Sequence, residues 1–261
     1  MTGNRRHVRL ASRGQHEWEF EFPRLRTPAY DRFHLALEEM GAGGSDRAEQ
    51  MLCALVDEYP EFIDARHHLA LLYVRSRRPA KALREWQLAV ETGLEALPVD
   101  FVFGRERMSW LSLDNRPFLR AYVGLGLAWE ERRMIGEACA IYENVLDLNP
   151  NDNQGVRHLA LACLFQMRRP QRVLEFCNRC DYEDYVLAFG RALALHILGS
   201  ADEARKAAIE AAAAFPHIAA EMRKTKHVRP KSRFPGYVTA GGADEAYEFW
   251  TRYGDFWKRS G

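Results

Sequence analysis

The stretch from Leu119 to Asp152 reads LRAYVGLGLAWEERRMIGEACAIYENVLDLNPND, and its apolar residues recur at helical spacing in two successive runs. The first run carries one stripe of small and large apolar residues: Tyr122, Leu125, Gly126 and Trp129. The second run carries another: Ala138, Tyr142 and Val145. Pro150 follows, where a continuing helix would lose a hydrogen-bond donor and clash with its own backbone. The stretch therefore predicts two short amphipathic helices folded back on each other.

This pattern of apolar positions resembles a tetratricopeptide repeat (TPR), a helix pair with a period of about 34 residues. The resemblance rests on seven residues of the stretch: Tyr122, Leu125, Gly126, Trp129, Ala138, Tyr142 and Pro150. It implies an all-α fold, a right-handed α-solenoid of stacked helix pairs that serves as a scaffold for protein interactions.

Residues equivalent to Ala138 mark further copies of the pair. Ala48 and Ala82 lie 34 residues apart, and Arg172 lies 34 residues after Ala138, with Ala204 as the last marker. A proline twelve residues after the marker supports the register in three copies: Pro60, Pro150 and Pro216. We therefore predict about five TPR-like helix pairs in residues 29–216. In the first copy, four residues are expected to face inward: Leu35, Ala36, Leu52 and Leu55.

Residues 1–28 form a tail before the repeats. Residues 1–16 are polar and basic, and we expect them to be poorly ordered. Acidic residues then alternate with Trp18, Phe20 and Phe22, which predicts a short extended strand with one apolar face. Such a strand has no sheet to join in a helical protein. It would lie along a groove, pair with a second copy to give a homodimer, or pack on the first helices.

An insertion of about 22 residues, at about residues 95–116, interrupts the repeats, because Ala82 and Ala138 lie 56 residues apart. It is rich in aromatic and other apolar side chains, so we expect it to be packed. Two interpretations remain open: the insertion covers an edge of the solenoid, or it forms a lid over the binding groove.

After the repeats, residues 217–242 read as a basic, irregular linker, and residues 243–258 predict an amphipathic helix that caps the array. The run at residues 223–233 is rich in Lys and Arg. It could bind nucleic acid, because clustered cations release counterions when they meet phosphate, or it could be a solvated linker. Nucleic acid is not the partner we expect.

The overall composition is that of a soluble globular protein, with 37 Lys and Arg against 36 Asp and Glu. No apolar run approaches the roughly 18 residues of a membrane span, and no secretory signal is visible, so we expect a cytoplasmic protein. The five cysteines are odd in number and suit reduced thiols. Cys177 and Cys180 form a single Cys-x-x-Cys, whose redox or metal role stays open.

The sequence contains no motif of a catalytic site. A nucleophile elbow, a phosphate-binding glycine loop and a His-Glu-x-x-His pair are all missing from it. We therefore predict that the protein is not an enzyme, with no catalytic residue, metal or cofactor.

In stacked helix pairs the first helices line the concave surface, so equivalent positions form columns of side chains along it. These columns predict the partner-binding residues: His34, Leu37, His67, His68, Leu71, Arg75, Arg120, Leu127, Arg157, His158, Leu161 and Phe165. Leucines flanked by imidazoles suit a peptide with apolar anchors. The alternative is that the leucines only pack neighbouring helices. Gly124 stands where three other copies carry histidine, which leaves a space in which the insertion could settle.

We therefore expect an adaptor that binds a peptide or protein segment in its groove. The alternatives are a nucleic-acid-associated protein that uses residues 223–233 and a self-associating regulatory scaffold.

Overall fold

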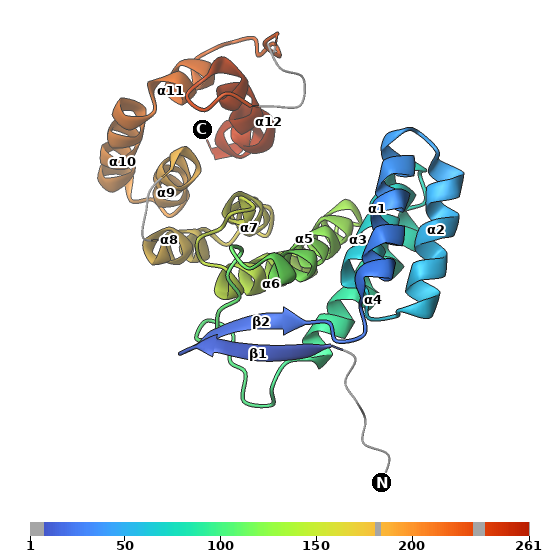
Figure 1. Ribbon diagram of the computed structural model, residues 1–261. Coiled ribbons are helices and arrows are strands. Elements are labelled where there is room, and N and C mark those ends of the chain that lie inside the picture. The colour runs from blue at the N-terminus through green and yellow to red at the C-terminus, as the bar shows by residue number, and fades with distance from the viewer. Residues whose placement is uncertain (1–7, 181–183, 232–237, 261) are drawn as a thin grey trace. The chain divides into compact units, whose positions relative to one another are not determined.

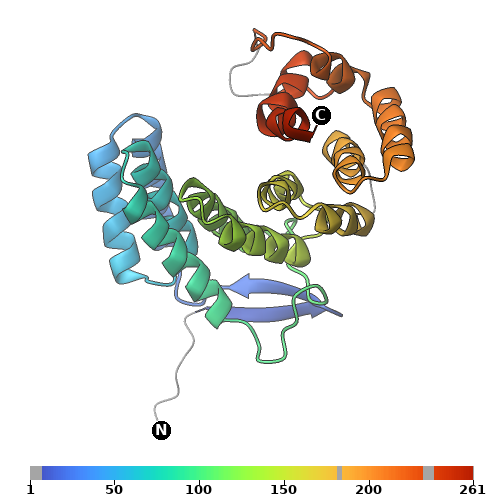
Figure 2. The same ribbon diagram turned by 180° about the vertical axis from the view of Figure 1, so that it is seen from behind.

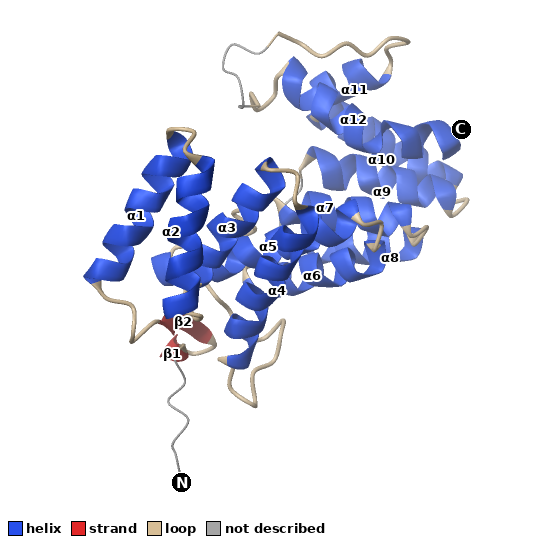
Figure 3. Cartoon of the chain, turned by 90° about the vertical axis from the view of Figure 1, so that its right-hand side faces the viewer, coloured by secondary structure: helices blue, strands red, loops and turns tan. Residues whose placement is uncertain are grey.

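The computed structural model describes residues 8–180, 184–231 and 238–260. The chain divides into two compact units, unit 1 (residues 1–157) and unit 2 (residues 158–261). The sequence alone indicated a single run of repeats and gave no sign of this division. Apart from one β-hairpin, the regular elements of the described chain are helical (Figure 3).

Unit 1 holds the β-hairpin and the first helix pairs (Figure 1). Its elements are β1 (Arg9–Gly14), β2 (Glu17–Glu21), α1 (Thr27–Gly41), α2 (Ser45–Glu58), α3 (Ile63–Arg75), α4 (Pro79–Glu95), a 3₁₀ turn at Leu113–Asn115, α5 (Arg116–Glu131) and α6 (Ile135–Leu148). Helix α3 packs on both α1 and α5, so the first helices of the pairs are neighbours. The predicted arrangement of stacked helix pairs is confirmed.

Two glycines set the close packing of α5. A Cβ atom at Gly126 would lie 2.4 Å from the ring of Tyr142 on α6, and one at Gly124 would lie 2.5 Å from the indole of Trp86 on α4. Helix α5 therefore approaches both neighbours more closely than a residue with a side chain would allow. The expectation that the insertion could settle at Gly124 is wrong, because Trp86 already fills that space.

The first helix pair differs from the second in the burial of one apolar position. Leu35 is 52% exposed, whereas Leu69, at the equivalent place in α3, is 1% exposed. The prediction that Leu35 faces inward is wrong, because no helix pair precedes α1 in the described chain to cover it. Ala36, Leu52 and Leu55 are buried, as predicted.

The N-terminal segment forms a hairpin rather than a lone strand. Strand β1 pairs with β2 in an antiparallel register that places Arg9 opposite Glu21 and Ala11 opposite Glu19. Arg13 bonds to the carboxylates of Glu19 and Glu21. The expectation that residues 1–16 are poorly ordered is therefore wrong for residues 9–14, which pair with β2 and whose Arg13 finds acidic partners there. Residues 1–7 lie outside the described residues.

The insertion is fastened to β2 by a buried asparagine. Asn115, which is 0% exposed, accepts a hydrogen bond at Oδ1 from the Phe20 N–H (3.0 Å). Its Nδ2 donates to the carbonyls of Trp18 (2.9 Å) and Ser109 (3.2 Å). The rings of Phe20 and Phe118 pack 5.1 Å apart, so β2 is also joined to α5.

The insertion runs beside the hairpin (Figure 2). Backbone hydrogen bonds hold it in place at two further points. Arg107 accepts at its carbonyl from Trp18 N–H (3.0 Å) and donates its N–H to the His16 carbonyl (2.7 Å). Met108 N–H donates to the Leu148 carbonyl at the end of α6 (2.8 Å). These contacts support the interpretation of the insertion as a segment that covers an edge of the helix pairs. They also occupy the edge of β2 that faces away from β1. A second copy of the chain could therefore pair with β2 only if β1 or the insertion were displaced.

Unit 2 contains the remaining helices. They are α7 (Val156–Gln166), whose first two residues belong to unit 1, α8 (Pro170–Arg179), α9 (Tyr185–Ile197), α10 (Ala201–Ala214), α11 (Pro216–Met222) and α12 (Ala243–Ser260). The prediction of an irregular linker is wrong for residues 217–222, which form α11. Helix α12 packs on α9 and α11 and is the predicted capping helix. None of the described helices has the length and apolar character needed to cross a membrane.

Candidate functional site

Side chains from α1, α3 and α5 form what we call the first-helix face of unit 1. It consists of Tyr30, His34, Leu37, Asp64, His68, Leu71, Arg75, Arg120 and Leu127. Within each helix these residues are three, four or seven places apart, which puts them on one side of it. Because α3 packs on α1 and α5, the three stripes lie next to one another.

A charged network joins α3 to α5 on this face. Arg120 donates from Nη2 to both oxygens of Asp64, at 2.9 and 3.1 Å. The Nδ1 atom of His68 lies 2.9 Å from the Asp64 carbonyl and 3.3 Å from its Oδ1. Burial alone would raise the pKa of Asp64, but the hydrogen bond from His68 and the charge of Arg120 bring it below its usual value. Asp64 therefore stays ionised and fixes the side chains of both Arg120 and His68.

Apolar side chains and further hydrogen-bond donors lie on the same three helices as this network. Leu127 is 42% exposed, and Leu37 and Leu71 are half-buried. His34 and Arg75 are exposed, and Arg75 reaches only the Met40 carbonyl, at 3.5 Å. The face thus combines apolar contact area with cationic or neutral hydrogen-bond donors at its edge.

His67 does not lie on this face. It is 8% exposed, and its Nδ1 accepts a hydrogen bond from the indole of Trp86 at 3.1 Å. Burial, with a smaller contribution from His68, lowers the pKa of His67 to about 3. His67 is thus a neutral core residue that joins α3 to α4.

The sequence prediction named Arg120 but left out Asp64, its partner, and Tyr30, whose ring packs edge-on against Phe62 at 5.4 Å. The signal for Asp64 was present, because an acid and a base stand at the same place in successive first helices. Burial and the nearby charges of Asp114 and Asp64 raise the pKa of Tyr30, so its hydroxyl stays protonated.

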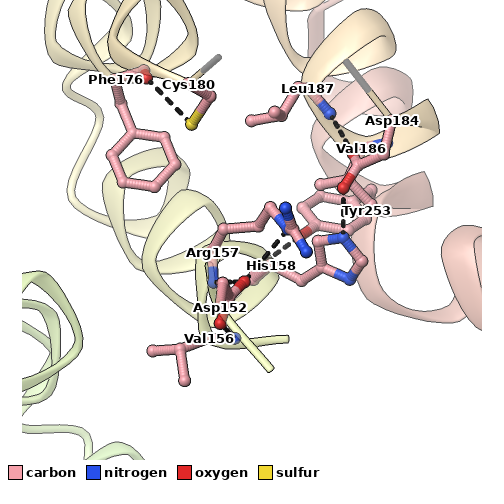
Figure 4. Close-up of polar contacts among 10 residues, drawn as sticks. All are labelled: Asp152, Val156, Arg157, His158, Phe176, Cys180, Asp184, Val186, Leu187 and Tyr253. Atoms are coloured by element: carbon pink, nitrogen blue, oxygen red, sulfur yellow. Dashed lines mark hydrogen bonds and ion pairs between the residues drawn. The ribbon is translucent and has the colours of Figure 1, made fainter. Parts of the chain in front are cut away.

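Arg157 belongs to unit 1 and serves the turn before α7. Its Nε lies 3.0 Å from Oδ2 of the buried Asp152, whose Oδ1 also accepts from Val156 N–H at 2.6 Å (Figure 4). This places Arg157 in a local cap instead of on the first-helix face.

In unit 2, His158 and Phe165 contact the chain's own helices. His158 Nε2 lies 2.9 Å from Oδ2 of Asp184, and the hydroxyl of Tyr253 on α12 donates to the His158 carbonyl at 2.5 Å (Figure 4). Phe165 stacks on Phe256 of α12, with ring centroids 5.4 Å apart. The C-terminal helix therefore occupies part of the predicted binding surface in this unit.

Leu161 is fully buried between α7 and α9. A Cβ atom at Gly190 would lie 2.7 Å from its Cδ2, so Leu161 packs where α9 has no side chain. For this leucine the structure matches the alternative in which the leucines pack neighbouring helices.

The described part of the basic run is partly neutralised within unit 2. Glu221, which is 2% exposed, pairs with Lys224 and, at 2.9 Å, with His227. The ring of His227 stacks on Trp250 of α12 at 4.0 Å, and Arg229 lies 3.5 Å from a carboxylate oxygen on the same helix. These contacts attach the segment to α12, and residues 232–237 lie outside the described residues.

The Cys-x-x-Cys sulfur atoms face backbone carbonyls. Cys177 Sγ donates to the Leu187 carbonyl at 3.6 Å. Cys180 Sγ donates to the Phe176 carbonyl at 3.5 Å, as Figure 4 shows. Within the described ranges, no group of three metal-binding side chains is present.

Comparison with known proteins gives structural neighbours only. No protein-family model and no curated protein matches the sequence. Among solved structures, the chain is similar to YrrB, a TPR protein with an unusual peptide-binding site (18% identity, TM-score 0.44), over 64% of this chain and 75% of that one. It is also similar to the TPR-like repeats of a putative kinesin light chain from Podospora anserina (14% identity, TM-score 0.49; 72% and 96% covered).

A third similar structure is PilF of Pseudomonas aeruginosa (16% identity, TM-score 0.32; 72% and 92% covered). The likeness to these proteins is limited to the helix-pair arrangement, and it says nothing about what this chain binds.

Proposed function

We propose that the protein is an interaction scaffold whose first-helix face in unit 1 binds a peptide or a protein segment. One observation carries the proposal. Leu127, Leu71 and Leu37 leave apolar area accessible beside the Asp64–Arg120 pair, which holds the neighbouring helices in register.

The chemistry of this face suits an extended or helical segment with apolar anchors. Complete burial of one exposed apolar anchor of the segment would contribute at most about 1.5–3 kcal/mol. His34 and Arg75, at the edge of the apolar area, would donate hydrogen bonds to carbonyl or carboxylate oxygens of the bound segment. Because Asp64 already fixes Arg120, little side-chain entropy is lost on binding.

The other predicted residues support a smaller site than the sequence indicated. His67 and Leu161 are buried in the core, Arg157 caps a turn, and His158 and Phe165 contact α12. We therefore restrict the proposed site to the first-helix face.

Co-purification with a matched control tests the proposal. The double variant Leu71→Asp, Leu127→Asp puts two charges on the face, while Leu111→Asp changes a leucine of the insertion that is 78% exposed. We expect the wild type and Leu111→Asp to retain the same partners, and the double variant to lose them by at least roughly tenfold, the equivalent of about 1.4 kcal/mol.

A second variant distinguishes loss of binding from loss of folding, because Leu71 is half-buried and its replacement by Asp could unfold α3. Arg75→Glu combined with Leu127→Asp changes only exposed side chains, and circular dichroism verifies that the helices persist. If quantitative mass spectrometry found the same proteins on every variant, the first-helix face would not be the binding site.

A further inference from the structure

Among the residues that the structure describes, none pairs with the outer edge of β1. The sheet has two strands among the described residues, and β1 pairs only with β2. The opposite edge of β2 is covered, because Trp18 and Phe20 bond to Arg107 and Asn115 of the insertion. Of the two edges of this hairpin, only that of β1 has no partner in the described parts of the chain, so it can pair with another strand.

The bonds on β2 fix which backbone groups β1 presents outward. The N–H groups of Trp18 and Phe20 point away from β1, toward the insertion. In an antiparallel ladder, residues directly opposite such positions also point their backbone groups away from the partner strand. Since Leu10 lies opposite Phe20 and Ser12 opposite Trp18, the N–H and C=O groups of Leu10 and Ser12 face outward.

The two faces of the hairpin differ in chemistry. Phe20, which is fully buried, lies on the same face as Leu10, because directly opposite residues share a face. Arg9 and Arg13 alternate with them and lie on the exposed face. No carboxylate of the described residues forms an ion pair with Arg9, which therefore offers an unpaired cation beside the open edge.

This charge pattern decides the kind of strand that fits. A second copy of β1, paired antiparallel about Ala11, would place Arg9 opposite Arg13, and like charges directly opposite are destabilising. A strand with acids at the positions facing Arg9 and Arg13 would form favourable cross-strand pairs. The residues between those acids would face the same side as the half-buried Leu10, so apolar side chains suit these positions.

We propose that the outer edge of β1 binds an extended segment of a partner protein, with alternating acidic and apolar residues, by adding a third strand to the hairpin. The chain's own β2, which reads EWEFE, shows that this pattern pairs with the inner edge of β1. The interaction uses a surface separate from the first-helix face and does not depend on it.

Fluorescence anisotropy with a labelled peptide of residues 16–22, HEWEFEF, tests the proposal on the full chain. We expect the peptide to bind the wild type and a lysine-for-glutamate version, HKWKFKF, to bind at least tenfold more weakly. Ser12→Pro removes an outward N–H from an edge where proline is tolerated, so it should weaken binding at least tenfold. Ser12→Ala is the control, because it keeps the N–H and removes only the hydroxyl that bonds to the Gly14 carbonyl.

Arg9→Glu is a second, independent test for the case in which Ser12→Pro disturbs the hairpin, because it leaves the backbone hydrogen-bonding groups unchanged. It should weaken binding of HEWEFEF and strengthen binding of HKWKFKF. The proposal is overturned if the wild type does not bind HEWEFEF, if both peptides bind equally, or if Arg9→Glu has no effect. Equal binding by a folded Ser12→Pro variant would also overturn it, because the peptide would then be displacing β2 from the inner edge.

Discussion

Replacing Gly124 by alanine should destabilise unit 1, although alanine is the better helix former. An added Cβ would lie 2.5 Å from Nε1 and Cε2 of Trp86 and 3.0 Å from its Cζ2. Trp86 is 4% exposed, and its indole is held by a hydrogen bond to His67. The ring therefore has to move within a packed core, which costs about 1–3 kcal/mol.

The helix itself gains from the substitution. Alanine is favoured over glycine in a helix interior by roughly 0.5–1 kcal/mol, so the net loss should be about 1 kcal/mol. For a domain of this size such a loss corresponds to a fall in Tm of roughly 2–4 °C. Urea unfolding followed by circular dichroism at 222 nm measures the loss in free energy of unfolding, with the transitions of the two units fitted separately.

Two comparisons make the reasoning refutable. Gly136→Ala, in the first turn of α6, has no atom within 4 Å of the new Cβ and should be neutral or slightly stabilising. In a Trp86→Phe background, Gly124→Ala should cost less, because the smaller ring removes the close atoms. If Gly124→Ala stabilises the protein as much as Gly136→Ala does, Trp86 does not limit the approach of α5.

Two further predictions follow from buried polar groups. Burial lowers the pKa of His67 from 6.5 to about 3, so unit 1 should lose stability as the pH falls from about 6.5 toward 3. Urea titrations at several pH values measure this dependence, and His67→Asn should flatten it. If the slope of stability against pH is the same in the variant, His67 is not a neutral core histidine. Tyr253→Phe removes the donor to the His158 carbonyl and should lower the stability of unit 2 by about 1 kcal/mol. Hydrogen exchange should then be faster for the amides of α12 in the variant than in the wild type. Equal exchange rates in the two proteins would show that the hydroxyl contributes nothing to stability.

The sequence predicted the helix pairs well because their signal is local. Gly126 and Tyr142 stand at repeat positions that can be recognised without knowing any contact, and the structure places them against each other. Leu35 carried the same signal and is nevertheless exposed, since burial at that place depends on a preceding helix pair that the described chain does not contain. Periodicity predicts which side of a helix is apolar, but the neighbour decides whether that side is covered.

The features that the sequence did not predict depend on distant partners. Strand β1 is polar and has no alternation of its own, and its order comes from β2 and from Arg13 pairing with acids. His67 and His68 are adjacent and looked equivalent, yet one bonds to Trp86 and the other to Asp64. Only the three-dimensional arrangement separates the core histidine from the one on the first-helix face.

The bond between Phe20 and Asn115 also has a consequence for the order of folding. It spans 95 residues, so the hairpin leaves the ribosome long before its anchoring asparagine is made. At synthesis rates of about 5–20 residues per second, the delay is roughly 5–20 s, far longer than the microseconds a hairpin needs to form. During that interval the helices α1 to α4 can pack, whereas the edge of β2 gains its bonds to Arg107 and Asn115 only after those residues have been made.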